Sequence, residues 1–406
     1  MTQHKETIDP LHPVKDDFLE NPYPIFDQMR SLSPIYWGSK SKQWLVTGYD
    51  LAAEITKDLR FEKRLERWNQ LNPITKMLPG PAHLIRTRQH WMLNENPPEH
   101  TQLRSLVNKA FSPRMVQQMK QHIQDIANDL TDKHKAAGKM EFIADFAFLL
   151  PITVIAEMLG IPMQDHAKFR EWSHHVTETA EDALNPVLLH RGNKAHDELV
   201  DYLKPLVDER RKAPKDDLIS ALINAEENGV SLDETALLGQ IVLMLVAGHE
   251  TTVNLIGNGL LALLKHPDQF QLLKDDPTLI DSTVEECLRF DSPVQTVKRL
   301  AGADMEFHGN KIRKGDMLVL FLGACNRDPA IFKDPHSFNI SRKENKHLAF
   351  SSGIHHCLGA SLARLEGQIA LRTIIEKLPQ IKLSGQELVH KRPFNLRGVR
   401  ELHVTF

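Results

Sequence analysis

The sequence lacks several features that mark common protein classes. Its three cysteines, Cys287, Cys325 and Cys357, are odd in number and widely spaced, which excludes a disulfide framework and favours a reducing compartment. Its 50 basic and 53 acidic residues leave no basic excess of the kind that nucleic acid or an anionic membrane attracts. We therefore expect small-molecule partners and no nucleic acid.

A long hydrophobic run is also missing. The most apolar stretch, 236–247, is interrupted by Gly239 and Gln240 and followed by His249 and Glu250, well short of the roughly 20 residues that span a bilayer. The first twenty residues contain seven charged side chains and no apolar region typical of a signal peptide. We expect a cytoplasmic protein with no membrane contact, in which residues 236–247 belong to a buried core helix.

What the sequence does have is an ordinary globular composition, 41% hydrophobic and 25% charged. Apolar residues recur at helical spacing through much of the chain, whereas short β-rich segments occur near 34–47, 305–312, 317–321 and 401–406. No linker divides the chain, although its length alone suggests about two or three domains. These patterns predict a mainly α fold with a minor β component, in a single domain over residues 1–406.

One long helix is predicted from about residue 232 to residue 264. Ser231 and Glu234 are spaced as a capping box at its start, and Pro267 lies just beyond its end. Its apolar pattern is interrupted by Ala-Gly-His-Glu-Thr-Thr at 247–252. A glycine and a polar cluster inside an apolar helix indicate a functional segment.

The clearest local signal is Phe-Ser-Ser-Gly-Ile-His-His-Cys-Leu-Gly at 350–359, followed by apolar residues at helical spacing. Cys357 is therefore expected where a loop enters a helix, whose N–H groups and dipole would lower the pKa of its thiol and suit a metal-binding thiolate. Two alternatives remain open from these residues alone. Cys357 is a buried apolar side chain in the first. In the second, His355, His356 and Cys357 bind zinc, although no further ligand pair lies nearby.

The spacing F-x-x-G-x-H-x-C-x-G in this segment resembles the heme-binding signature of the cytochrome P-450 superfamily. Glu286 and Arg289 match the E-x-x-R motif of that family, and residues 326–329 with Phe338 and Arg342 match a third motif. The resemblance extends over nearly the whole chain. It implies a single-domain cytochrome P-450 fold that is mainly α, with a long central helix over a heme b cofactor.

The resemblance implies that Cys357 is the thiolate ligand of the heme iron. Glu286, Arg289 and Arg342 are implied to form a buried structural network that braces the cysteine loop. Ser351 departs from the pattern, because many relatives carry glycine at that position, and it leaves less clearance beside the heme. Further residues implied to contact the heme or its propionates are His100, Arg104, Ala247, Arg299, Phe350, Gly353, His355 and Gly359.

The interrupted helix resembles the segment in which this family activates dioxygen. Gly248 would let the helix open a groove over the iron, while Glu250 and Thr251 would supply an acid and a hydroxyl for proton delivery. Thr251 bonding back to a helical carbonyl is the structural alternative. His249 is expected to face away from the groove.

The expected substrate is a lipophilic small molecule, such as a polyketide or macrolide, steroid, terpenoid or fatty acid. A variable lid is implied around 78–91 and 169–189, where Arg86, Arg88 and His90 are a less favoured site for a carboxylate. The implied pocket residues are Leu243, Met244, Ala247, Val294, Gln295, Val297 and Phe394.

The implied reaction inserts one oxygen atom of dioxygen into a C–H bond. Because no nucleotide-binding signature is present, electrons are expected from a separate protein. The resemblance implies that this protein is a ferredoxin or flavodoxin with its reductase. A basic patch of Lys109, Arg114, Lys343 and Lys346 would receive that partner, and the protein is expected to be a monomer. A peroxide-using enzyme of the same fold is the alternative, and a heme-thiolate sensor is a less favoured one.

Overall fold

The computed structural model describes residues 8–11, 14–63, 91–179, 185–227, 229–392 and 394–406. Within them the chain is mainly helical, as predicted. The helices, with short 3-10 or π segments labelled η, are α1 (Asp16–Glu20), α2 (Tyr23–Leu32), α3 (Tyr49–Lys57), η2 (Met92–Asn94), α6 (Glu99–Ala110), α7 (Pro113–Gln118), α8 (Lys120–Lys135), η3 (Ile143–Ala147), α9 (Leu149–Met158), η4 (Met163–Asp165), α10 (His166–Glu178), α11 (Pro186–Lys212), α12 (Leu218–Asn224), α13 (Glu234–Lys265), α14 (Pro267–Asp275), η5 (Pro277–Leu279), α15 (Ile280–Phe290), α16 (Leu322–Cys325), η6 (Gly353–His355) and α17 (Ala360–Lys377).

A five-stranded sheet has the order β1-β2-β10-β7-β3. Its central pairs are antiparallel between β10 and β7 and parallel between β10 and β2, with Leu318 opposite both Arg299 and Trp44. Smaller sheets join β11-β12-β4, β5-β6 and β8-β9. The strands are β1 (Ile35–Gly38), β2 (Gln43–Val46), β3 (Phe61–Glu62), β4 (Lys139–Glu141), β5 (Glu226–Glu227), β6 (Val230–Ser231), β7 (Thr296–Ala301), β8 (Met305–Phe307), β9 (Asn310–Ile312), β10 (Met317–Phe321), β11 (Lys382–Leu383) and β12 (His403–Thr405).

The four predicted β-rich segments all contain strands, and β10 covers the predicted range 317–321. The sequence analysis did not identify β7, whose polar Lys298 and Arg299 break the apolar alternation of a half-buried strand. The predicted capping box of the long helix is wrong. Ser231 lies in β6, and the helix is capped by Asp233, whose carboxylate accepts the Ala236 N–H at 2.7 Å.

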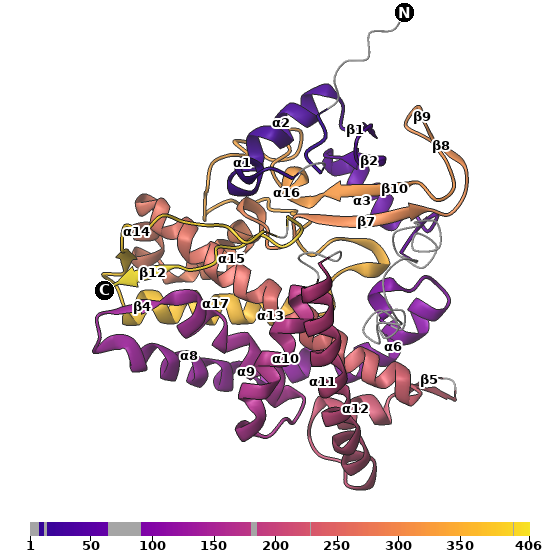
Figure 1. The fold of residues 1–406 in the computed structure, drawn as a ribbon. Helices are drawn as coiled ribbons and strands as arrows, with labels where there is room; N and C mark the ends of the chain where they lie inside the picture. Colours follow the sequence, from indigo (N-terminus) through magenta and orange to yellow (C-terminus); the bar gives the residue numbers. More distant parts are fainter. Residues whose placement is uncertain (1–7, 12–13, 64–90, 180–184, 228, 393) are drawn as a thin grey trace, which may run out of the picture.

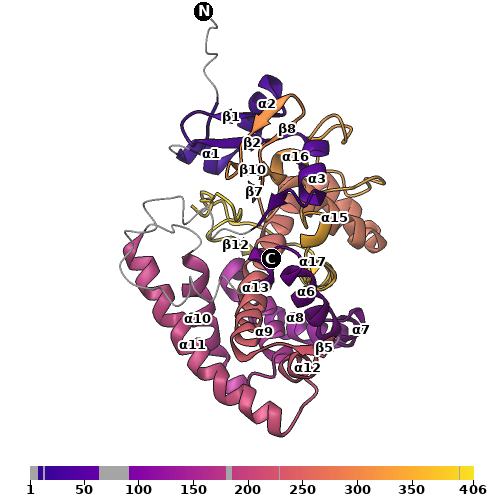
Figure 2. The same ribbon diagram turned by 90° about the vertical axis from the view of Figure 1, so that its right-hand side faces the viewer.

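The molecule has a sheet side and a helical side (Figures 1 and 2). The five-stranded sheet lies with α1 and α2 at one end, and the larger body of helices lies below it. α13 runs through that body and packs against α9, α15 and α17. It is long and apolar enough to cross a membrane, but 67% of its most apolar window is buried inside the protein, as expected for a core helix.

Candidate active site

The loop at 350–359 is a tight structure in which backbone conformation is decisive. Gly353 has φ +70°, and a Cβ there would collide with the carbonyl oxygen of Thr56 in α3. Both the conformation and the close approach therefore require glycine. Ser351 adopts φ +58°, a left-handed conformation that disfavours a serine. The backbone conformation at position 351 would thus favour the glycine that the resemblance implies there.

Cys357 is exposed at the end of this loop, just before α17 begins at Ala360. Its N–H donates to the Phe350 carbonyl at 3.0 Å, which closes the loop. The prediction that the helix start lowers the pKa of its thiol is wrong in its net direction. Although part of the residue surface is exposed, the protein packed around the thiol desolvates it. This desolvation raises the pKa and outweighs the lowering effects of the Gly359 N–H, Arg104 and Arg364.

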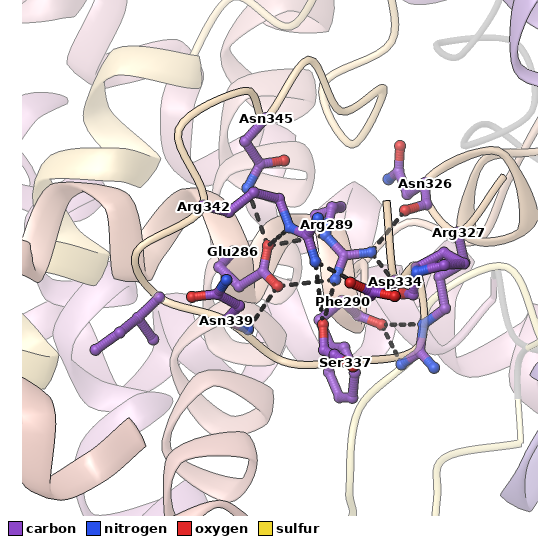
Figure 3. Close-up of polar contacts among 12 residues, drawn as sticks. Glu286, Arg289, Phe290, Asn326, Arg327, Asp334, Ser337, Asn339, Arg342 and Asn345 are labelled. Atoms are coloured by element: carbon purple, nitrogen blue, oxygen red, sulfur yellow. Dashed lines mark hydrogen bonds and ion pairs between the residues drawn. The ribbon is translucent and has the colours of Figure 1, made fainter. Parts of the chain in front are cut away.

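The predicted ion pair on α15 is present and fully buried. Glu286 and Arg289 have no exposed surface, and two hydrogen bonds of 2.8 Å join them. Arg342 adds a third contact, from its Nε to Glu286 Oε2 at 3.1 Å. Figure 3 shows the Glu286 carboxylate between these two guanidinium groups, with Asn339 and Asn345 also donating to it.

The remaining donors of Arg289 bind carbonyl oxygens of Asn326, Pro335 and Ser337 at 2.8–3.0 Å. These carbonyls belong to the segment that leads into the cysteine loop, so the network fixes that segment against α15. The charged groups of Glu286 and Arg289 are satisfied, as buried charges require, whereas the Asn345 Oδ1 atom is buried without a hydrogen-bond partner among the described residues.

A second brace was not identified in the sequence. Glu285 accepts from Arg364 of α17 at 2.6 and 3.0 Å and pairs with His347 at 3.1 Å. These partners outweigh burial and lower the pKa of Glu285 to about 2. Because Glu285 neighbours Glu286 on α15, adjacent carboxylates hold the segments before and after Cys357. The contact between Glu285 and Arg364 joins residues that are far apart in sequence, so it is seen only in the folded structure.

The predicted cationic residues His100, Arg104, Arg299 and His355 are brought together in the structure. The ring centroids of His100 and His355 lie 4.3 Å apart. The pKa of His355 is lowered to about 2, first by burial and then by the nearby basic groups of Lys63, Arg299, His100 and Arg104. Arg299 Nη2 and His100 Nδ1 are buried and have no hydrogen-bond partner among the described residues. Buried nitrogen atoms without a partner, such as these two, indicate a binding site for an anionic ligand.

Lys63 belongs to this cationic cluster and was not identified from the sequence. It follows β3, and burial with the nearby Arg299 and Lys298 lowers the pKa of its ammonium group to about 7. Nothing in the sequence around Lys63 distinguished it from an ordinary surface lysine.

The interrupted segment of α13 is open on one side. Ala247 and Gly248 are exposed, although the helix is buried on either side of them, and a Cβ at Gly248 would meet nothing within 4 Å. Gly359 likewise has open space at its Cβ position. His249 faces the opposite way, as expected, with its ring edge-on to Phe148 at 4.4 Å.

The two predicted proton-delivery residues have different partners. Thr251 Oγ1 donates to the Ala247 carbonyl at 2.8 Å, so the back-bonding alternative is observed, while the hydroxyl oxygen keeps its capacity to accept. Glu250 forms an ion pair with Lys391. This partner lowers the pKa of Glu250 against the opposite effect of burial. The sequence analysis did not identify Lys391.

The predicted pocket residues fall into two groups. Leu243 and Met244 are almost fully buried on α13, and Val294 and Val297 are half-buried. The expectation for Gln295 is wrong: its side chain has no exposed surface, donates to Ser292 O at 2.7 Å and packs on Gly323, so it has no surface to offer a substrate.

Phe394 packs mainly among the aromatic rings of Phe18, Phe26 and Phe321 near the N-terminus, which fixes one side of its ring. Of the predicted lid, Arg86, Arg88 and His90 lie outside the described residues.

Comparison with known proteins identifies the family to which the chain belongs. The family model for cytochrome P450, written here cytochrome P-450, matches residues 45–393. The chain belongs to the cytochrome P-450 family. Family membership identifies it as a heme-binding oxidoreductase of the monooxygenase type that uses dioxygen, a lipophilic substrate and a redox partner.

The chain is similar over its whole length to characterised cytochromes P-450. It is 40% identical to the biotin biosynthesis cytochrome P-450 of Bacillus subtilis, covering 97% of this chain and 98% of that one. It is 39% identical to the monooxygenase PikC of Streptomyces venezuelae, covering 100% and 97%. A crystal structure of a cytochrome P-450 bound to an acyl carrier protein that bears hexadec-9Z-enoic acid superposes with a TM-score of 0.88, 39% identity and coverage of 96% and 99%.

The residues of the described chain fit a heme b group. Cys357 is exposed and lies at the end of a loop whose conformation requires glycine at position 353. Gly248 and Gly359 leave open space where a Cβ atom would lie. The buried Arg299, which has no carboxylate partner among the described residues, together with Arg104 and the nitrogen donors of His100 and His355, matches the two carboxylates of the propionates. The zinc alternative gains no support, because the one candidate metal group found among the described residues is His174, His175 and Glu178 on α10.

Proposed function

We propose that the protein hydroxylates a lipophilic small molecule, with Cys357 as the heme-iron ligand and electrons from a separate ferredoxin or flavodoxin system. The observation that carries this proposal is the combination of the exposed Cys357 with the buried Arg299, which has no carboxylate partner among the described residues. Bound heme b with a thiolate ligand supplies dioxygen activation and transfer of one oxygen atom to a C–H bond.

The protein's own residues would orient the cofactor and guide protons. Cys357 would bind the iron, while His100, Arg104, Arg299 and His355 would pair with the propionates. Phe350, Gly353, Gly359 and Ala247 would line the faces of the macrocycle. Leu243, Met244, Val294, Val297 and Phe394 remain proposed substrate contacts, and the apolar character of most of them supports a lipophilic ligand.

On the oxygen side, Gly248 would provide clearance. The Thr251 hydroxyl would accept a proton that Glu250 brings from solvent and donate its own toward the open space beside the helix. The exposed position of Ala247 and Gly248 supports this arrangement.

The first test is the absorption spectrum of the purified protein, reduced with dithionite under carbon monoxide. A Soret band strongly red-shifted from that of histidine-ligated heme is expected, because a thiolate donates more electron density to the iron. The band should disappear in Cys357→His. Its absence from heme-supplied wild-type protein would refute thiolate ligation and return the sensor alternative to consideration.

A second test separates dioxygen chemistry from the peroxide alternative. In Thr251→Ala, product formed per NAD(P)H consumed should fall, because the chain loses the hydroxyl that would pass on a proton from Glu250. Unchanged coupling would remove Thr251 from proton delivery. Full activity with hydrogen peroxide and none with a reductase system would favour the peroxide-using enzyme instead.

The redox partner is proposed to dock on the cysteine side at Lys109, Arg114, Lys343 and Lys346. All four are exposed, which supports their availability. Reversing the charges of Lys343 and Lys346 should slow the first electron transfer at low salt and have less effect at high salt. An unaltered rate at low salt would exclude this surface. We further propose that the protein is a cytoplasmic monomer with one domain over residues 1–406.

The substrate class is proposed from the relatives. One similar structure contains an acyl carrier protein with a fatty acyl chain, and another, 37% identical with a TM-score of 0.88, contains myristic acid. A relative that is 39% identical is named for polyketide biosynthesis, and another that is 37% identical is a vitamin D(3) 25-hydroxylase. A further similar structure, 33% identical with a TM-score of 0.84, contains testosterone. Fatty acids, polyketides and steroids are therefore the ligands to screen first, by the shift of the Soret band on binding.

A further inference from the structure

α13 carries a stripe of polar side chains that faces the protein interior. Glu250, Asn254 and Asn258 are spaced four residues apart, so they lie on one face of the helix. Their exposed fractions are 9%, 2% and 3%. Polar groups buried on an otherwise apolar core helix need partners from another element.

That element is the segment 390–399, which we call the C-terminal hairpin because His390 and Val399 form an antiparallel bridge. Lys391 pairs with Glu250, and its Nζ donates to Asn254 Oδ1 at 3.1 Å. Asn258 Nδ2 donates to the Arg397 carbonyl at 3.0 Å. The hairpin therefore contacts the whole polar stripe.

Close packing of the backbone makes this contact specific. A Cβ at Gly398 would collide with the Asn254 side chain, so only glycine lets the hairpin lie so near to α13. Gly398 also accepts the Lys391 N–H at 2.8 Å, which fixes the start of the lysine side chain.

The hairpin is held from its other side as well. Arg397 donates to Asp291 at 2.6 Å, and His390 pairs with Glu20 at 2.7 Å. The backbone of the hairpin around Lys391 is thus held by groups from the N-terminal region and from the end of α15. The Lys391 ammonium group extends from this fixed backbone to Glu250.

Three basic groups face Glu250: Lys391 from the hairpin, His249 from its own helix, and His174 from α10. Burial by itself would raise the pKa of the carboxyl group, and these groups reverse that direction, with Lys391 contributing the most. His249 contributes little positive charge at neutral pH, because burial lowers its own pKa to about 4. Lys391 is therefore the cation that keeps Glu250 ionised.

We propose that Lys391 is a positioning residue for proton delivery: it holds Glu250 ionised and engaged with the C-terminal hairpin, and this pair must open before Glu250 can carry a proton. Once separated from Lys391, the buried carboxylate takes a proton from water and passes it to the Thr251 hydroxyl, which donates its own proton onward. No electron moves in these steps. The inference rests on the proposed monooxygenase function and adds a residue from outside the family motifs.

The test compares Lys391→Met, Lys391→Arg and the double variant Lys391→Met with Glu250→Gln, all as purified heme-loaded enzyme. Product per NAD(P)H consumed is measured from about pH 6 to about pH 9, together with the melting temperature. The neighbouring Arg392→Met is the matched control, because the Arg392 side chain is 72% exposed.

In Lys391→Met, the unpaired carboxyl group should hold its proton to higher pH, so the pH dependence of coupling should shift by about one unit or more toward alkaline pH. Lys391→Arg should retain the wild-type profile. The melting temperature of Lys391→Met should fall increasingly below that of wild type as pH rises above about 5, because an unpaired buried carboxylate must then ionise. Replacing Glu250 with Gln should remove this pH-dependent loss.

A uniform loss of coupling at every pH, or a loss of stability that Glu250→Gln does not relieve, would overturn the proposal and leave Lys391 as a structural anchor. If Lys391→Met does not fold, Lys391→Gln provides the same comparison. A wild-type protein without the thiolate Soret band would refute the proposed function itself. A normal band, with Thr251→Ala uncoupled and the Lys391→Met profile unshifted, would refute this inference alone.

Discussion

Two clusters of ionisable side chains, one around Glu286 and one around His355, are built in opposite ways. Around Glu286, one carboxylate receives two arginines and two asparagine donors, and the other donors of Arg289 bind backbone carbonyls. Around His355, only basic groups meet, and Arg299 Nη2 and His100 Nδ1 have no partner among the described residues.

The difference teaches how to tell a structural network from a ligand site. A balanced cluster satisfies its own charges, so it stabilises the fold and offers nothing to a ligand. A cluster of basic groups without an acid costs stability by itself, because burial opposes their protonation and leaves the Arg299 charge unbalanced, and a bound anion would supply the counter-charge. Substitutions around Glu286 should therefore mainly lower the stability of the fold, whereas substitutions around His355 should mainly weaken heme binding.

The largest effect is expected from Glu286→Gln in the balanced cluster. Removing this carboxylate leaves Arg289 buried without a counter-charge, which should cost about 3–5 kcal/mol of unfolding free energy. Denaturant titration measures the change. Glu344→Gln, at an exposed site in the same region, is the control and should change stability by less than about 0.5 kcal/mol. Equal effects of the two substitutions would mean that the network is not a stability element.

In the unbalanced cluster, Arg299→Gln should weaken heme retention without comparable loss of folding. A charge-assisted hydrogen bond is worth about 1.5–3 kcal/mol, so heme should transfer to apomyoglobin about tenfold to a hundredfold faster. Arg313→Gln, at an exposed position just before β10, controls for the loss of a positive charge. A large drop in stability with normal heme retention would assign Arg299 to the structural class instead.

A smaller effect, with a defined pH dependence, is expected at Lys63. Its pKa of about 7 means that above this pH the lysine must gain a proton when a propionate binds beside it. Heme affinity of the wild type should thus decline by severalfold as pH rises from about 7 to about 9. Lys63→Met should bind heme more weakly at low pH and lose this decline. The same slope in both proteins would exclude Lys63 from the propionate site.

The smallest effect is expected in the cysteine loop. Ser351→Gly should raise stability by about 0.5–1 kcal/mol, because glycine adopts φ +58° without steric cost. The neighbouring Ser352 has φ −150° and bonds Thr56 at 2.5 Å, so Ser352→Gly should instead lower stability. A denaturation midpoint that falls in both variants would contradict the assigned strain at Ser351.

Much of this architecture was predictable because its residues are close in sequence. The spacing of Glu286 and Arg289 on one helical turn predicted their pairing, and the pattern around Cys357 predicted a loop entering a helix. The opened segment of α13 was recognisable because glycine and polar residues interrupt an apolar helix.

Other features depend on contacts between distant segments. Gln295 was expected in the pocket from the resemblance to the family, but its side chain packs closely on Gly323 and has no exposed surface. The pKa of the Cys357 thiol was expected to fall from local helix effects, and the surrounding protein raises it. Neither outcome follows from neighbours along the chain.

The sequence by itself indicated the family, the cysteine loop and the interrupted helix, because each pattern consists of residues that are close in sequence. Only the tertiary structure decided which charged groups meet in the site and how the pKa values of these groups shift. Lys391 reaches Glu250 from 141 residues away, and Lys63 joins cations from other elements. The physical reason is that charge interactions and burial depend on distance in space, which only the folded chain sets.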